Sequence, residues 1–426
     1  MLRKVMIYLF FAGTAGGLLF GTPGLLSRFQ EGHIPANYGS IVTWGLWVAT
    51  YIYFVGLSAG SFLVSSLVFV FGIKRLEAIG RLALLTALVT LLMALISIGL
   101  DLGHLERAWH VYVWPNFGSP MAWMIWLYST YMLLLCCEAY FLMRRDFFAG
   151  RGEAGLRGVI NRVLSAGIDG ASTEARDADL RIVRVLASIG VPLAIMFHGG
   201  VGALFGVLAS RPMWHSGLYP VLFLVSAVVS GGAAITLLAY VFLDRDRNRG
   251  DILRFLGALV LGVLTFEVIW ELAEIAVYMY GRMPSHVAAW ELVLAGPYPY
   301  VFWVGQVGFG SLVPIVLLTI GLKRNWHGVI AAGCMFIAAA FLTVRLNMVI
   351  PALSVEEIRG LTDAYASPRW TSSYLPSLME WQVTLFVVGL GGALLTLGWH
   401  LLPLHVTEKP AVGEGTSSMR SVERVS

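Results

Sequence analysis

The chain has 426 residues, of which 58% are hydrophobic and only 13% are charged, and its mean hydropathy is +0.77. These values exclude an ordinary soluble domain, and the formal net charge of +4 is too small to indicate a class of partner. The positions of the charges along the chain are more informative than their sum.

Ten apolar segments follow one another along the chain, and each is long enough to cross about 30 Å of hydrocarbon as a helix. They lie at about residues 5–26, 41–72, 80–101, 120–143, 181–209, 217–243, 252–280, 299–321, 327–350 and 380–402. Arg3 and Lys4 precede the first segment as in a signal peptide, but it is too long for one, so we expect a retained span. The sequence therefore predicts an all-α, polytopic membrane protein with about ten transmembrane helices.

The Lys and Arg residues are distributed unevenly between the two sides of these spans. If the N-terminus is inside, only six of the 29 fall on the outer side, and Arg345 lies within a span. The six are Arg28, Arg107, Arg211, Arg282, Arg359 and Arg369. Because cytoplasmic loops are rich in Lys and Arg, this asymmetry predicts that both termini are cytoplasmic.

Two longer connections and a weak repeat suggest how the spans are grouped. A basic connection lies at 144–180 and an outer, Pro-containing connection at 351–379. Small residues mark the second span, at Gly56 and Gly60, and the sixth, at Ser230 and Gly231. This repeat predicts two four-helix bundles, at about 41–209 and 217–350, with flanking helices in a domain of residues 1–405. The polar residues 406–426 are expected to form a disordered cytoplasmic tail.

Three acids lie within the seventh apolar segment. The spacing of Glu267, Glu271 and Glu274 puts them on one face of a helix. An ionisable side chain at bilayer depth costs several kcal/mol unless it faces protein or water, so the stripe indicates proton or quinone chemistry. Arg345 must pair or snorkel, and we expect a pair with Glu271 or Glu274, which is alternatively a purely structural ion pair. Glu138 is either the start of a cytoplasmic proton route or a snorkelling acid.

Polar residues also gather where the third span ends on the outer side. Asp101, His104 and Arg107 would give a quinone head group hydrogen bonds and protons. The further residues expected in this pocket are Trp109, Asn116, Ser119 and Trp123, with Trp123 packing on the ring. The alternative is an interfacial salt bridge beside a Trp of the aromatic belt.

His198 is the only histidine near the middle of a span. It is either a hydrogen-bonded packing residue or a proton carrier, because imidazole titrates near neutrality. Its singularity argues against a bis-histidine haem. Cys136, Cys137 and Cys334 lack the spacing of a metal or iron–sulfur site and are expected to be small buried side chains. Electrons that pass through this chain therefore need a partner or a diffusible cofactor.

Several motifs in this order resemble the NrfD/PsrC family of polysulfide reductase-like membrane subunits, over nearly the whole chain to about residue 405. The residues that carry the resemblance are Trp44 and Trp47, Gly56 to Gly60, Asp101 with Gly103, Arg107 and Trp109, Ser119-Pro120 with Trp123, His198, Arg211-Pro212 with Trp214, and Ser226 with Ser230-Gly231. Arg345 with Asn347, and Tyr374 to Trp381, are similar to the long ten-helix branch that includes DsrP, HmcC and HybB.

The resemblance implies a location in the cytoplasmic membrane of a bacterium or archaeon. It also implies a polypeptide without haem, iron–sulfur cluster or other metal that binds menaquinone or ubiquinone near the outer face. Such subunits exchange electrons with an extracytoplasmic iron–sulfur subunit of the four-cluster ferredoxin type, within a larger respiratory oxidoreductase. One departure is that the family often has Asp-Leu-Gly-Arg-Pro, whereas this chain has Asp101-Leu102-Gly103-His104-Leu105.

Three functions fit these features. The first is a quinone-interacting anchor subunit, with its site at Asp101, His104 and Arg107 and with His198 and the three glutamates carrying protons. The second is a proton-translocating module without a quinone redox site of its own. The third is a secondary transporter, although matched Gly or Pro interruptions of its helices are not evident.

Overall fold

The computed structural model describes residues 2–167, 173–243, 247–358 and 360–404. These residues form helices and connections without a β-strand. The long helical segments are α1 (Leu2–Glu31), α2 (Leu46–Phe69), α3 (Glu77–Asp101), α5 (Pro120–Ala149), α7 (Thr173–Gly206), α8 (Tyr219–Phe242), α9 (Arg247–Gly281), η3 (Val301–Leu312) continued by α11 (Val313–Arg324), α12 (His327–Ser354) and α13 (Leu378–Leu401). Shorter pieces are η1 (Lys74–Leu76), η2 (Leu105–Arg107), α4 (His110–Val113), α6 (Gly155–Leu164) and α10 (Pro284–Ala295).

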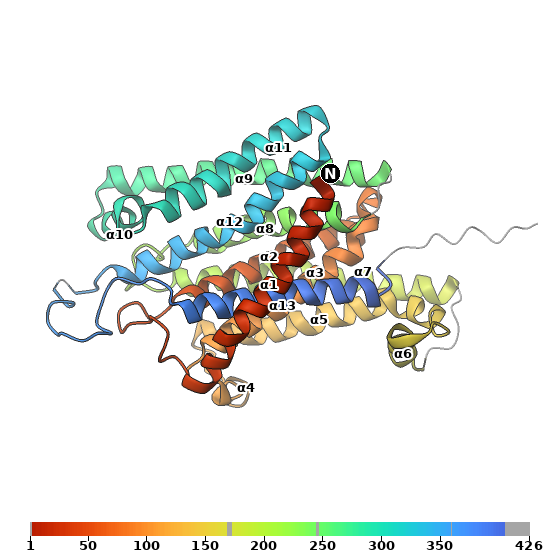
Figure 1. Cartoon of the computed structure of the whole chain (residues 1–426), viewed down its shortest axis with the longest axis horizontal. Helices are drawn as coiled ribbons and strands as arrows, with labels where there is room; N and C mark the ends of the chain where they lie inside the picture. The colour runs from red at the N-terminus through yellow and green to blue at the C-terminus, as the bar shows by residue number, and fades with distance from the viewer. Residues whose placement is uncertain (1, 168–172, 244–246, 359, 405–426) are drawn as a thin grey trace, which may run out of the picture.

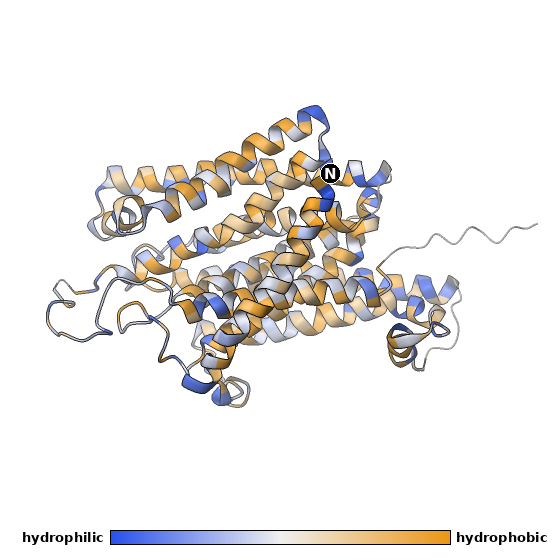
Figure 2. Cartoon of the chain, in the orientation of Figure 1, coloured by the Kyte–Doolittle hydropathy of each residue, from blue (hydrophilic) through white to orange (hydrophobic). Residues whose placement is uncertain are grey.

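The ten spans predicted from hydropathy are confirmed, because ten helical segments of the described residues are long and apolar enough to cross a membrane. Figure 1 shows most of them running side by side along the long axis of the molecule, with α1 crossing over α13. Hydrophilic residues gather at the helix ends, and the stretches between them are mainly hydrophobic (Figure 2). The protein is a multi-pass membrane protein.

The helices pack as two groups of four. α2, α3, α5 and α7 contact one another, and so do α8, α9, the η3–α11 segment and α12. α1 packs along α13, and α13 in turn packs against α3. The two groups meet where α2 contacts α8, and α7 also contacts α8 there.

Small residues allow α2 and α8 to approach closely. A Cβ atom on Gly60 would lie 1.9 Å from the carbonyl oxygen of Ala227, and one on Gly231 would lie 2.5 Å from the Cα atom of Gly60. Any larger side chain at either position would therefore overlap the facing backbone. The repeated small residues in the sequence thus lie at the contact between the two helix groups.

The helices differ from the predicted apolar segments mainly at their ends. The 144–180 connection is largely helical, because α5 continues to Ala149, α6 follows, and α7 begins at Thr173. Arg144 and Arg145 hold this arrangement by binding the carboxylate of Asp179. The helix α12 likewise continues to Ser354, beyond its predicted end. The expected tail at 406–426 lies outside the described residues.

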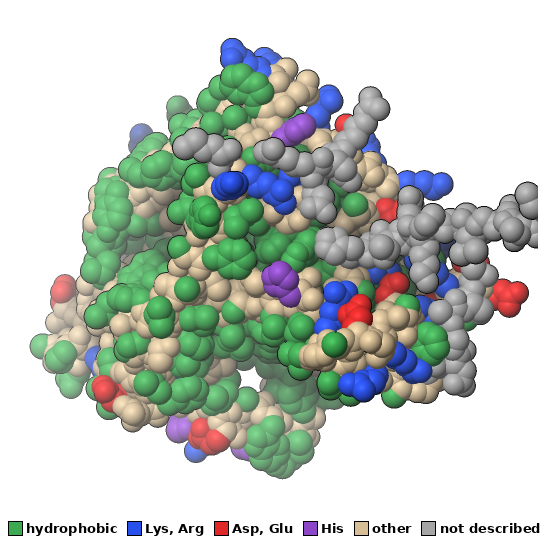
Figure 3. Space-filling view, turned by 45° about the vertical axis from the view of Figure 1, so that its right-hand side comes forward, with side chains coloured by type: hydrophobic (Ala, Val, Ile, Leu, Met, Phe, Trp, Pro, Cys, Tyr) green, Lys and Arg blue, Asp and Glu red, His purple; other side chains and the backbone are tan. Residues whose placement is uncertain are grey.

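The charged residues of this connection form one end of the molecule. Figure 3 shows Lys and Arg side chains gathered on the end where α6 lies, while the neighbouring flank is largely hydrophobic. At the opposite end lie the α4 and α10 helices (Figure 1), and α4 follows closely after α3, which ends at Asp101. The candidate site residues therefore lie toward the end that is poor in basic residues.

The contact between α2 and α8 gives a first prediction. Replacing Gly60 with Ala should lower the free energy of unfolding by about 1–3 kcal/mol, because the facing backbone of α8 must move. The matched control is Gly16→Ala on α1, where a Cβ atom would meet nothing within 4 Å. Thermal unfolding in detergent measures both variants, and a loss of the same size in both would contradict the close contact.

Candidate functional site

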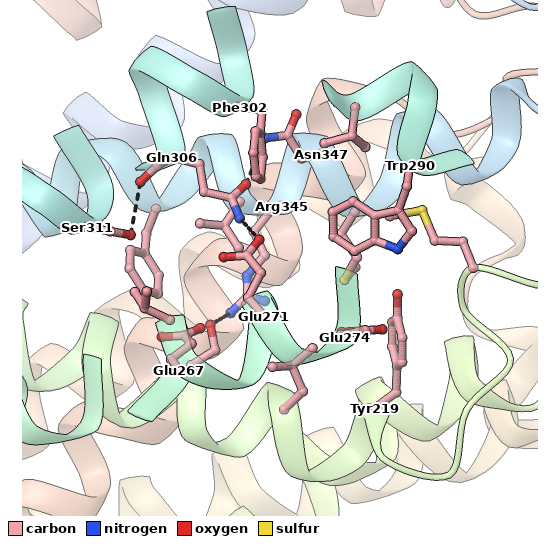
Figure 4. A pocket seen from close by; sticks show the side chains of 18 of the residues that line it. Tyr219, Glu267, Glu271, Glu274, Trp290, Phe302, Gln306, Ser311, Arg345 and Asn347 are labelled. Carbon is pink, nitrogen blue, oxygen red and sulfur yellow. Dashed lines mark hydrogen bonds between the residues drawn. The ribbon is translucent and has the colours of Figure 1, made fainter. Parts of the chain in front are cut away.

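The three acids of α9 line one cavity of about 80 Å³ inside the second helix group. Its other polar side chains come from α8, α10, η3 and α12, and are Tyr219, Ser226, Trp290, Gln306, Ser311, Arg345 and Asn347 (Figure 4). Glu267 is buried, while Glu271 and Glu274 are partly buried. The stripe predicted from the i, i+4, i+7 spacing thus faces the protein interior.

A series of hydrogen bonds crosses this cavity from α12 to α9. The Asn347 Nδ2 donates to Gln306 Oε1 at 2.7 Å, and the Gln306 Nε2 donates to Glu271 Oε1. Figure 4 shows the Gln306 and Glu271 side chains pointing toward one another. Two amides therefore connect a buried carboxyl group to the far wall of the cavity.

Gln306 reaches this position from an unusual backbone. Residues Val301–Leu312 form a π-helix, which is wider than an α-helix, and the Ser311 hydroxyl donates to the Gln306 carbonyl at 3.1 Å. π-helical turns are rare and occur frequently at functional sites. The sequence analysis missed Gln306, although an amide within an apolar segment was a usable signal.

The expected ion pair of Arg345 is wrong. The guanidinium Nη2 donates to the Ser226 hydroxyl at 2.6 Å, and the group lies 5.1 Å over the Phe223 ring. Among the described residues, Arg345 has no acid within ion-pair distance. Glu267, which lines the same cavity and also faces the Ser226 hydroxyl, is the acid whose charge acts on Arg345. Glu271 is held by Gln306 instead.

His198 lies outside this cavity, on α7 of the first group. Its Nε2 binds the Phe223 carbonyl at 2.7 Å, and its Nδ1 has no hydrogen-bond partner among the described residues. The imidazole is fully buried and faces Phe223 on α8. The guanidinium of Arg345, from α12, lies over the same Phe223 ring. A hydrogen bond to a backbone carbonyl is typical of a histidine that packs in a protein core. The role of His198 in proton transfer stays a prediction.

Glu138 on α5 is fully buried in the first helix group, and neither of its carboxyl oxygens has a hydrogen-bond partner in the described structure. The alternative that it snorkels to the membrane surface is therefore wrong. The Tyr131 hydroxyl, two turns away on the same helix, is also buried without a partner there. Two unpartnered polar groups in an apolar bundle are costly, so a functional reason or bound water is needed to explain them.

Asp101 lies in a second, partly buried polar group, where α1 and α3 end and α2 and α13 begin. Its Oδ1 accepts a hydrogen bond of 2.8 Å from the Tyr38 hydroxyl. The Tyr38 ring stacks on Tyr374, whose hydroxyl donates to Glu380. Burial raises the pKa of Tyr38 well above its ordinary value, so its hydroxyl remains a donor.

His33 packs on the same group, with its ring 5.8 Å from Tyr38 and 5.6 Å from Trp47. Its buried Nε2 has no hydrogen-bond partner among the described residues. Burial lowers the pKa of this imidazole below its ordinary value, and the charge of Arg28 acts in the same direction. His33 is therefore neutral at physiological pH, with one nitrogen that can donate and one that can accept.

The other residues predicted beside Asp101 lie elsewhere. His104 and Arg107 are exposed and approach Glu106, at 2.9 and 3.8 Å. Trp109, on the connection that follows, and Trp123, in the first turn of α5, are about half exposed. Asn116 binds the Gly118 backbone, and Ser119 caps α5. The structure thus brings Asp101 together with Tyr38 and His33, and not with the rest of the predicted pocket.

The sequence analysis did not find this arrangement because its members come from three distant segments, at residues 33–38, 101 and 374–380. The contact of Tyr38 with Asp101 joins residues 63 positions apart, and Glu380 accepts a hydrogen bond from the backbone of Asn37, 343 positions away. No periodicity could reveal such contacts. The only available signal was the polar character of His33 and Tyr38 just before the second span.

The described residues contain no group of three or more His, Cys, Asp or Glu side chains placed to hold a metal ion. The α9 cavity combines acids with amides, and the group around Asp101 combines acids with phenols. Both groups can bind and transfer protons. Together with the ten spans, they define a polytopic membrane protein with buried ionisable groups.

Comparison with known proteins identifies the family. The model of the family described as "Polysulphide reductase, NrfD" matches residues 34–356, so the protein belongs to the NrfD family. It is 36% identical to the C subunit of selenate reductase from Mesobacillus selenatarsenatis, over 96% of each protein. It is 22% identical to the integral membrane subunit of menaquinone reductase of Nitratidesulfovibrio vulgaris, over 85% of this sequence and 84% of the relative. It is 25% identical to the C component of polysulfide reductase from Wolinella succinogenes, over 72% and 93%.

These relatives are membrane subunits of reductases, and the protein is accordingly a membrane subunit of an oxidoreductase. The resemblance seen in the sequence motifs is confirmed. The relatives are named for different reductases.

The contacts of Arg345 give a second prediction. Replacing Arg345 with Met should lower the free energy of unfolding by about 1–3 kcal/mol, because Ser226 loses a buried donor and Glu267 loses the positive charge that faces it. Adding Glu267→Gln should recover part of this loss, since the uncompensated carboxyl group is removed. Thermal unfolding in detergent is measured for the two single variants and the double variant, with the exposed Lys323→Met as a control. Strictly additive losses would show that Arg345 and Glu267 are not coupled.

Proposed function

We propose that this protein is the quinone-interacting membrane subunit of a multi-subunit respiratory oxidoreductase. It exchanges electrons between menaquinone or ubiquinone and an extracytoplasmic iron–sulfur subunit of the four-cluster ferredoxin type. The proposal is supported by the family and by one relative that is named a menaquinone reductase subunit. A bound quinone supplies the two-electron, two-proton chemistry, and the protein supplies binding groups and protons.

The observation that carries this proposal is the polar group of His33, Tyr38 and Asp101. The unpartnered Nε2 of His33 can donate to a quinone carbonyl when it carries the ring proton, and it can accept from a quinol hydroxyl when it does not. The Asp101 carboxylate can accept a proton, and it is positioned by the Tyr38 hydroxyl. Hydrogen bonding and proton exchange are thus available within one buried group at the end of the first helix bundle.

The remaining predicted residues have proposed roles around this group. His104 and Arg107 would exchange protons between Asp101 and the outer solvent, because both are exposed just beyond it. Trp109, Asn116 and Ser119 lie on the connection that follows, and Trp123 lies in the first turn of α5; this region is largely exposed. Exposed aromatic side chains are enriched at protein interfaces, so this connection suits contact with the iron–sulfur subunit as well as with a quinone ring.

The proposed orientation places both termini in the cytoplasm and the Asp101 end outside, in the cytoplasmic membrane of a bacterium or archaeon. The separation of the basic end around α6 from the end with Asp101 supports this orientation. Electrons would then leave on the side where the extracytoplasmic iron–sulfur subunit docks.

A second candidate function is a proton-translocating module, and the cavity of α9 favours it. Glu267, Glu271 and Glu274 follow one another along α9, and Gln306 and Asn347 extend the polar line to α12. Glu138 and His198 would add proton-carrying groups in the first bundle. In the proposed function, the same residues supply or remove the protons of the quinone reaction.

A third prediction tests the quinone site. In the purified complex, Asp101→Asn should weaken binding of a fluorescent hydroxyquinoline N-oxide, a quinol analogue, at least about tenfold, which is about 1.4 kcal/mol. The reason is that the amide cannot accept the proton of the ligand hydroxyl as a carboxylate does. Fluorescence quenching measures the dissociation constant. Glu31→Gln on the exposed end of α1 is the matched control, and unchanged binding in Asp101→Asn would remove Asp101 from the site.

A fourth prediction separates the two candidate functions. Glu271→Gln keeps a side chain that can bind Gln306 but removes the ionisable proton, so quinol oxidation and proton release should fall together, at least about tenfold. Both rates are measured in vesicles that contain the complex, with the exposed Glu291→Gln on α10 as the control. Loss of proton movement with quinol oxidation intact would instead favour the proton-translocating module.

A further inference from the structure

A second, larger cavity lies at the outer end of the second helix group. It has a volume of about 500 Å³ and is enclosed by α10, η3, α12, the start of α13 and the outer connection before it. Pockets of about 300–1,000 Å³ with apolar walls and a few polar groups are typical of small-molecule sites. Asp101 does not line this cavity, and the sequence analysis placed no site there.

The walls of this cavity are mostly apolar and aromatic. Rings of Tyr298, Tyr300, Tyr374 and Trp381 line it, and the remaining walls are largely aliphatic. Among its lining residues, Tyr300, Val304 and Leu375 are each more than half exposed, so the cavity is open on one side. A ligand with a long apolar tail could therefore enter from the hydrocarbon and leave its tail there.

One end of the cavity is polar and is connected to the acids of α9. Asn347 and Val293 line both this cavity and the smaller one that contains Glu271. The Asn347 amide gives one N–H to Gln306, and within the described residues its second N–H and its oxygen make no other hydrogen bond. Figure 4 shows the line from Asn347 through Gln306 to Glu271.

The charge of the cavity restricts its ligand. Its lining residues, all of which belong to the described part of the protein, include no Lys, Arg, His, Asp or Glu. A phospholipid phosphate would lack a cation here, and a fatty acid carboxylate would lack one too. A neutral ring with carbonyl or hydroxyl groups instead matches the amide of Asn347 and the hydroxyl of Thr343.

We propose that this cavity is a second quinone-type site, separate from the one at Asp101, in which the Asn347 amide holds the head group. The proposal rests on the proposed function, since it assumes that a quinone is the ligand of this protein. The two hydrogen bonds through Gln306 orient the Asn347 amide and link it to the Glu271 carboxyl group. The ring of Tyr374 forms another wall of this cavity and stacks on Tyr38, so the two sites are neighbours.

The test counts the sites in the purified complex. Two equivalents of the fluorescent hydroxyquinoline N-oxide should bind per polypeptide. Fluorescence quenching measures this number in a titration at a protein concentration well above the dissociation constant. Asn347→Leu removes the amide and Val304→Phe fills the cavity, so each should lose one equivalent or weaken it at least about tenfold. The control is Val316→Phe on α11, which is similarly exposed and lines neither cavity. Thermal unfolding of each variant shows that the fold is retained.

The outcomes distinguish this proposal from the one at Asp101. Two equivalents that persist in both cavity variants, or a single equivalent that is lost only in Asp101→Asn, would overturn the second site and leave the first. A single equivalent lost in the cavity variants but kept in Asp101→Asn would support the cavity and overturn the first site. A fall in bound phospholipid phosphorus in Val304→Phe, with probe binding unchanged, would show a lipid site and overturn the proposal.

Discussion

The close contact between α2 and α8 positions the buried charge of Arg345 in this membrane subunit. Because Gly60 and Gly231 have no side chains, the two helices approach until backbone meets backbone. This contact fixes the position of α8, and with it Ser226, which holds the buried guanidinium of Arg345. The charge of Arg345 in turn faces Glu267 on α9. A packing contact between two small residues therefore determines where a charge can be accommodated at bilayer depth.

The sequence predicted the features of this fold that depend on local patterns. Hydropathy located the ten spans, and helical spacing placed Glu267, Glu271 and Glu274 on one inward face. It could not predict the partner of Arg345, because that depends on the relative depth of α8, α9 and α12. Nor could it predict the π-helix around Gln306, since a π-helix has no clear sequence pattern. The neighbours of Asp101 were missed because they come from distant segments.

The two polar groups differ in how many of their polar atoms have a hydrogen-bond partner within the protein. Around Asp101, phenol hydroxyls and backbone N–H groups donate to carboxylates, and most partners are provided by the protein. In the α9 cavity, one oxygen of Glu267 and the indole N–H of Trp290 have no partner among the described residues. Buried polar groups of this kind usually bind ordered water. Such water would complete the polar line between α9 and α12.

The direction of the acid stripe has a consequence for energy conversion. Seven residues of helix separate Glu267 from Glu274, which is about 10 Å along the helix axis, or about a third of the hydrocarbon thickness. A proton that moved between them would cross about a third of the membrane voltage, so each 100 mV would change its free energy by about 0.8 kcal/mol. A neutral ligand in the uncharged cavity would experience no such force. Voltage would then act on the proton traffic of this subunit while leaving the occupancy of that cavity unaffected.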